Sequence, residues 1–248
     1  MTSRRPMFYF KYRKYFLENS IFKVYFCILL FASIIVTYGT ITTKDALFNI
    51  EYISSSGVIN VIIFSIFVFN AIKYYTMFND EYMFISRFKG KNECKKNLFK
   101  QFTTINEIIF LMYICLLISV IFFMSFGKVK EIFNPVLNVS YFVTIPFQFL
   151  RIFLILDILT KIVANLYTYN KKIMFAVYFG ICSMIFFGDV SRTLSEINSL
   201  KEFPLFFTSY FDNNIGFSNV LLFSLAFCIQ LSILYFINYL IEKRIDLL

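Results

Sequence analysis

The charged segment of this chain that is most informative about its fold is MFNDEYMFISRFKGKNECKKNLFKQFTTIN, residues 77–106. Apolar sequence long enough to cross a bilayer lies on both sides of it, from about Val58 to Tyr75 and from about Ile108 to Phe126. Its basic residues are Arg87, Lys89, Lys91, Lys95, Lys96 and Lys100. Loops this rich in lysine and arginine stay on the cytoplasmic side of a membrane. The stretch therefore predicts a cytoplasmic connection between two transmembrane helices.

The same stretch also carries the signals of a short helix of its own. Asn79 can cap the first turn, in which Asp80 and Glu81 complement the positive end of the helix dipole. Gly90 is placed to terminate the helix. The apolar residues between these signals are Met83, Phe84, Ile85 and Phe88. Two interpretations stay open at this point: an ordinary positively charged loop, or a docking helix that contacts a soluble partner.

The composition of the chain indicates an all-α integral membrane protein. Hydrophobic residues make up 59% of its 248 residues, and several apolar runs reach the ~18–20 residues that span hydrocarbon as a helix. In lipid a helix satisfies its own backbone polar groups, so these runs should be helical. The net charge of +9 does not indicate nucleic-acid binding, because the basic residues sit at the edges of the apolar runs. We expect one transmembrane domain over residues 1–248.

Six apolar runs predict six transmembrane helices. Their approximate bounds are residues 21–41, 58–75, 108–126, 139–167, 173–187 and 217–241. The alternating basic and aromatic residues 1–20 predict an interfacial helix that meets anionic lipid. A signal peptide is the competing interpretation, but the apolar run after it is too long for one.

The segment between the fifth and sixth predicted spans contains two apolar patches, Leu194–Leu200 and Phe203–Phe211. A solvent-exposed disordered loop would not carry so many aromatic residues. We therefore predict two short helices that re-enter the membrane from the outer side.

The basic residues also predict the orientation of the chain. With six spans, 18 lysines and arginines fall on the side that holds both termini, and 5 fall on the opposite side. This asymmetry predicts a cell-membrane protein whose N- and C-termini are both cytoplasmic.

The residue types needed for catalysis are mostly missing. The sequence has no histidine, which excludes histidine-based acid–base catalysis and most transition-metal sites. It has no GxxxxGK[ST] loop, and its five cysteines form no CxxC pair. We therefore expect no catalytic residue, no metal site and no cofactor in this chain.

The fourth predicted span contains polar residues within the apolar run. Arg151 falls ~18 Å below the outer end of the span, close to the bilayer midplane, and Gln148 lies on the same helical face. Asp157 can pair with Lys161 one turn later as an anchor near the cytoplasmic edge. A charge at the midplane normally faces protein or a water-filled cavity. Arg151 is thus either a structural contact to another helix or part of a substrate path or subunit seam.

Taken together, these parts resemble the permease subunit of type-2 ABC exporters. The resemblance covers nearly the whole chain as architecture, and its most specific segment is DEYMFISRFKGKNECKKNLFKQ, residues 80–101. It departs from the family pattern at Asn92 and Glu93, where an aromatic residue is often found. The resemblance implies a coupling helix in the cleft of a separate ATPase, contacted through Asp80, Glu81, Met83, Phe84, Arg87 and Phe88.

The resemblance further implies partners and a substrate class. ATP and Mg would be bound by the ABC ATPase subunits, and a second copy of this chain or a related permease would complete the translocation path. Among such permeases, the chain most resembles small bacterial ones for peptide export or immunity. The resemblance therefore implies an amphipathic peptide or lipid-like substrate. The alternative function is a non-transport immunity or scaffold subunit, and a membrane-embedded enzyme is a more distant third.

Overall fold

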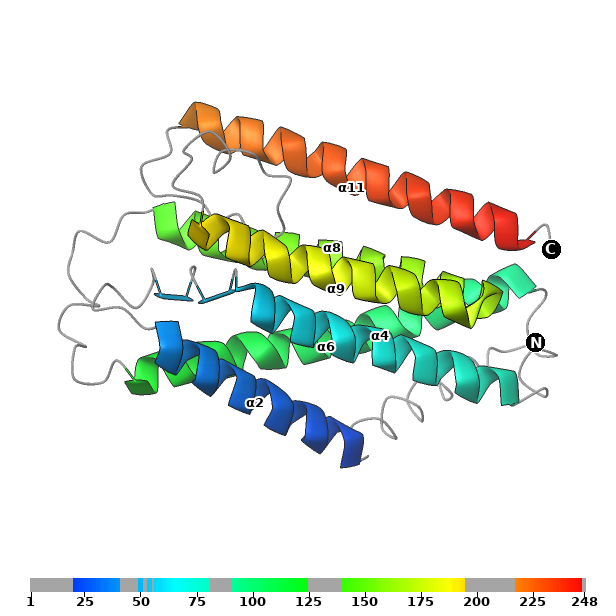
Figure 1. The fold of residues 1–248 in the computed structure, drawn as a ribbon, viewed down its shortest axis with the longest axis horizontal. Helices are drawn as coiled ribbons and strands as arrows, with labels where there is room; N and C mark the ends of the chain where they lie inside the picture. The colour runs from blue at the N-terminus through cyan, green and yellow to red at the C-terminus, as the bar shows by residue number, and fades with distance from the viewer. Residues whose placement is uncertain are drawn as a thin grey trace, which may run out of the picture.

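The computed structural model describes residues 20–40, 49–50, 53–54, 56–80, 91–124, 140–194 and 217–246. Within this part of the chain the fold is all-helical, as predicted, with six long helices (Figure 1). These are α2 (Ser20–Thr40), α4 (Gly57–Asp80), α6 (Lys91–Met124), α8 (Ser140–Tyr169), α9 (Lys171–Leu194) and α11 (Phe217–Asp246).

The six helices lie roughly side by side and alternate in direction (Figure 1). The end of α4, the start of α6, the α8–α9 turn and the end of α11 therefore lie together at the right of the view. We call this the basic end of the bundle. Among the described helices, every lysine and arginine except Arg151 and Arg192 lies in the half of its helix nearer to this end.

Helices α4 and α8 form the centre of the bundle. Helix α4 packs against α2, α6, α8 and α9, and α8 packs against α4, α6, α9 and α11. Helices α2 and α11 lie at opposite edges (Figure 1). Aromatic rings join the central helices: Phe153 of α8 contacts Phe67 of α4 and Phe110 of α6 at centroid distances of 6.1 and 5.4 Å. The two central helices therefore connect all the others into one packed body.

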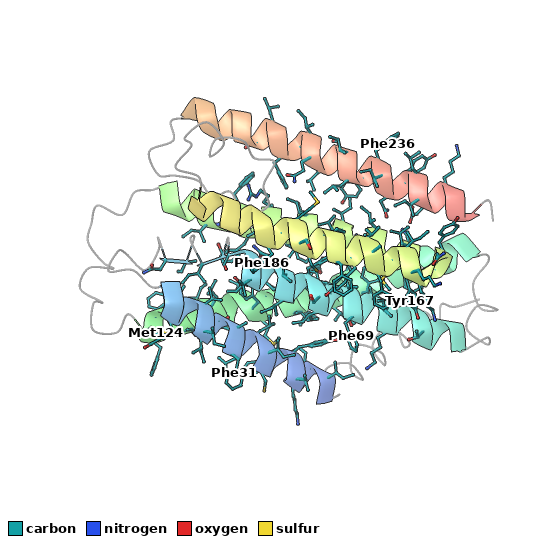
Figure 2. All side chains as sticks on the ribbon, viewed as in Figure 1. Phe31, Phe69, Met124, Tyr167, Phe186 and Phe236 are labelled. Atoms are coloured by element: carbon teal, nitrogen blue, oxygen red, sulfur yellow. The ribbon has the colours of Figure 1, made fainter. Side chains whose placement is uncertain are left out.

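The outer surface of the bundle is apolar. Phe31 on α2, Phe123 on α6 and Phe236 on α11 are 64%, 83% and 61% exposed, and Figure 2 shows Phe31 and Phe236 on the outward sides of their helices. Residues 21–39 and 99–124 each form a helix long and apolar enough to cross a membrane, and Gly57–Lys73 is a shorter apolar stretch. An apolar outer surface of this kind is suited to contact with lipid, which indicates association with a membrane.

Helix α6 begins well before its apolar run. It starts at Lys91, and Phe102, Ile105 and Ile109 lie on its buried face. The buried stripe therefore continues below the part of the helix that can lie in hydrocarbon. At about 1.5 Å per residue its 34 residues extend about 51 Å, well beyond the ~30 Å of a hydrocarbon core.

The prediction that Asn79 caps a separate helix is wrong. Asn79 and Asp80 are the last two residues of α4, which continues without interruption from Gly57. No glycine or proline follows Gly57 in this helix to stop it. Adding one more residue to an existing helix costs far less than nucleating a new one, so the helix runs on through the polar residues.

The chain just before α4 is packed into the bundle. Ile50 and Ile53 are buried in the hydrophobic core, and the side-chain amide of Asn60 donates a hydrogen bond of 3.3 Å to the Ser54 carbonyl. The sequence predicted no element in this connection. Its two isoleucines are too few to form a recognisable pattern, yet they fill space between the long helices.

Three predicted elements fall outside the described residues. They are the interfacial helix in residues 1–19, the remainder of the coupling helix in residues 81–90, and the greater part of the re-entrant helices in residues 195–216. They remain predictions.

Candidate functional site

Arg151 is the largest fully buried side chain among the residues that the structure describes. Only 1% of it is exposed, whereas the adjacent Leu150 is 53% exposed. Arg151 is the twelfth residue of α8, about 16 Å along the helix from Ser140. Helix α8 thus turns the guanidinium toward the interior of the bundle and the leucine toward its outer surface.

Gln148 lies one helical turn before Arg151 and is buried to the same extent. The prediction that these two side chains share one face is therefore confirmed, and that face is turned toward the interior of the bundle. The guanidinium offers five N–H donors, and the glutamine amide offers donors and an acceptor. Together they can bind an anionic or carbonyl group, such as the backbone of a peptide or a phosphate ester.

Aromatic contacts to α6 fix the position of α8 beside Arg151. The Phe149 ring lies edge-on to Phe110 and Tyr113 of α6, at centroid distances of 6.2 and 6.5 Å. On the other side, the Phe147 ring lies 5.8 Å from Phe227 of α11. Because three helices meet around this part of α8, a relative movement of α6 or α11 would change the surroundings of Gln148 and Arg151.

The Asp157 side chain is buried inside the bundle, whereas an anchor at the membrane edge would be exposed. Its carboxylate is buried and lies 2.6 Å from the Lys161 ammonium, as the i,i+4 spacing predicted. It also accepts a hydrogen bond of 3.3 Å from the Thr103 hydroxyl of α6. The pair is thus part of the α6–α8 contact, a role that the sequence did not reveal.

Three further hydrogen bonds join different helices through polar side chains. Asn70 of α4 donates to Asn106 of α6 at 3.2 Å, and Asn165 of α8 donates to Asn238 of α11 at 3.0 Å. Ser65 of α4 and Tyr178 of α9 share a hydrogen bond of 2.7 Å. Asparagines inside apolar helices were the available signal for these contacts, but their partners lie 36 and 73 residues away in sequence.

Of the six residues expected to contact an ATPase, only Asp80 belongs to the described part of the chain. Asp80 ends α4 at the basic end of the bundle, whereas Glu81, Met83, Phe84, Arg87 and Phe88 lie outside the described residues. Asp80 itself lies at the end of α4, whereas Gln148 and Arg151 lie farther along the bundle on α8. Among the described residues, no three histidine, cysteine or acidic side chains cluster to hold a metal ion.

Comparisons with protein-family models, with curated proteins and with solved structures found no match to this chain.

The Asp157 contact gives a prediction about stability. Asp157→Ala should lower the free energy of unfolding by about 1.5–3 kcal/mol, because hydrogen bonds to a charged group are lost and the threonine hydroxyl keeps no acceptor there. The measurement is denaturation of the purified protein in mixed detergent micelles. The matched control is Glu107→Ala, which removes an exposed acid from α6. Equal effects of the two substitutions would contradict a role for Asp157 in the α6–α8 contact.

Proposed function

We propose that this chain is the membrane-spanning permease subunit of an ABC exporter, driven by a separate ATPase. In this proposal α2, α4, α6, α8, α9 and α11 are the six spans, and both termini are cytoplasmic. The distribution of charge supports this orientation: the described lysines and arginines, Arg151 and Arg192 apart, gather in the half of the bundle nearer to the basic end. The positive-inside rule assigns that end to the cytoplasm.

The main support for the proposal is the place where α4 ends and α6 begins. Helix α4 continues to Asp80 and α6 begins at Lys91, both at the basic end of the bundle (Figure 1). Within α6 the apolar stretch covers residues 99–124, so the residues before it extend beyond the hydrocarbon. In this proposal the connection between α4 and α6 lies on the cytoplasmic side, where a soluble ATPase can contact it.

The packing of α4 supports a route for force from this connection to the interior. A helix transmits a push along its axis, and α4 contacts α2, α6, α8 and α9. Nucleotide-driven closure of the ATPases would press on residues 80–90 and displace α4 and α6 together, because Asn70 and Asn106 link them. The displacement would tilt α6 against α8 and open the face that carries Gln148 and Arg151 to the substrate.

Arg151 fits a translocation path for an amphipathic peptide or lipid-like molecule. A buried charge is retained at a cost in stability, and intramembrane charges commonly mark substrate paths. ATP and Mg would be bound by the partner, and this chain would supply binding and passage. The alternative, an immunity or scaffold subunit that holds a partner through the same connection, requires no movement of α8.

The orientation can be tested by cysteine labelling in a variant that lacks the five native cysteines. Cysteine at Tyr38, which is exposed near the end of α2, should react with a membrane-impermeant maleimide added to intact cells. Cysteine at Asn170 or Lys243, both exposed and near the basic end, should react only after the cells are opened. Labelling at Asn170 from outside would overturn the orientation and the cytoplasmic contact that depends on it.

Contact with an ATPase can be tested by substitutions that change the charge in residues 80–90, with a control at the opposite end of the bundle. Asp80→Arg and Phe88→Asp should each reduce ATPase co-purification and stimulated hydrolysis by at least tenfold while leaving the spans inserted. The matched control is Asp189→Arg, which makes the same change near the opposite end of α9. Normal association and hydrolysis in both test variants would mean that residues 80–90 are a passive connection. Normal association with no transport by the wild-type complex would favour the scaffold alternative.

The role of Arg151 can be separated from its contribution to folding. Arg151→Ala should reduce uptake of a fluorescent amphipathic peptide into inside-out vesicles by at least tenfold, with assembly of the complex retained. Removing a buried charge can leave stability unchanged, because its desolvation cost disappears as well. Arg192→Ala is the control for loss of an arginine elsewhere. If Arg151→Ala fails to assemble while Arg151→Gln is fully active, the guanidinium has a structural role and the path assignment is wrong.

A further inference from the structure

An open apolar groove of about 500 Å³ runs along the outer side of α2. One residue of α4, Ile62, contributes to it. The other lining residues all belong to α2 and are Lys23, Val24, Cys27, Ile28, Phe31, Ala32 and Ile35. The groove is therefore formed by the surface of α2 where this helix meets α4. It is separate from the buried face of α8 that carries Arg151.

The side chains explain both the shape and the polarity of the groove. Ala32 is small and buried, so it forms a floor, whereas Phe31 and Ile35 project outward beside it. Almost all of the lining surface is hydrocarbon. Such a surface cannot favour a polar ligand along its length, but it can hold a single flexible alkyl chain.

Lys23 supplies the one charged group of the lining, and it lies toward the basic end of the bundle. It is exposed and makes no ion pair with any residue that the structure describes. Between Lys23 and Ile35 the helix rises about 18 Å, which is more than half of a ~30 Å hydrocarbon core. The groove thus places a cation at one end of an open apolar surface that follows α2 for about 18 Å.

We propose that this groove binds one acyl chain of an anionic phospholipid, with the lipid phosphate at Lys23. The inference rests on the membrane placement of the bundle, but not on transport or on an ATPase. A lipid satisfies both features of the site at once: the alkyl chain covers the apolar lining, and the phosphate pairs with the ammonium at the depth of the headgroups.

A second copy of this chain is a poorer occupant of the groove. Two copies related by a two-fold axis along the membrane normal would place each residue at the same depth as its counterpart. The two Lys23 ammonium groups would then approach each other, and α2 contains no acidic residue to compensate for them. Charge complementarity therefore favours a lipid with a negative headgroup.

The fluorescence of an introduced tryptophan can report on the groove, because the chain contains no tryptophan of its own. Phe31→Trp places a single tryptophan in the groove, and Phe236→Trp places a matched one on the similarly exposed surface of α11. The full-length variants are reconstituted in vesicles of phosphatidylcholine and phosphatidylglycerol, with bromine on the acyl chains of one or the other lipid. Quenching of tryptophan emission then reports which lipid lies beside each position.

The expected result at position 31 is a preference of about fivefold for phosphatidylglycerol, the ratio that corresponds to about 1 kcal/mol per basic side chain. Lys23→Gln should remove the preference and keep the quenching, whereas Ala32→Phe should fill the groove and reduce quenching by both lipids. Position 236 should show no preference.

Equal quenching by both lipids at position 31 would overturn the anionic-lipid site. Quenching at position 236 but not at position 31, restored when the protein is diluted, would assign the groove to a second copy and overturn the proposal. No quenching at either position would instead contradict the membrane placement itself, so the two failures are distinguishable.

Discussion

The burial of polar side chains in apolar surroundings constrains how the helices of this structure are rotated. A charged or amide side chain that faced lipid from the middle of a helix would lose its hydration without replacement. In the bundle Gln148, Arg151 and Asp157 are turned toward other helices, while Leu150 and Phe123 face outward. Once these rotations are set, the faces that α6 and α8 present to each other follow.

The polar contacts also distinguish one arrangement of helices from others that are equally apolar. Lipid tails are as apolar as leucine, so burial alone provides little preference between helix partners in a membrane. The Asn70–Asn106 hydrogen bond makes α6 a specific partner of α4, and the Asn165–Asn238 hydrogen bond makes α11 a specific partner of α8. Each such bond contributes only about 0.6 kcal/mol on average, but it also specifies rotation and register. Aromatic contacts such as Phe110–Phe153 then fill the space between the specified faces.

The central position of α4 and α8 connects this packing to the proposed function. Helix α4 ends in the segment proposed to meet the ATPase, and α8 carries the buried face proposed to meet the substrate. The two helices contact each other directly, through residues such as Phe67 and Phe153. The groove on α2 lies at the edge of the bundle, where a bound lipid would support α2 without entering this route.

The helical class, the burial of one α8 face and the gathering of basic residues at one end were all predictable from the sequence. These follow from hydrophobic length, from i,i+3 and i,i+4 spacing, and from charge, all of which are local properties. Part of the site was predictable for the same reason: Gln148 with Arg151, and Asp157 with Lys161, are neighbours on one helix.

The contacts of Thr103 with Asp157 and of Asn70 with Asn106, and the burial of Ile50 and Ile53 in the core, are visible only once the helices are packed together. The structure also shows that α4 continues through Asn79, where the local capping signal indicated a new start. These outcomes depend on which helices become neighbours, and that choice is a sum of many weak contacts between residues distant in the chain.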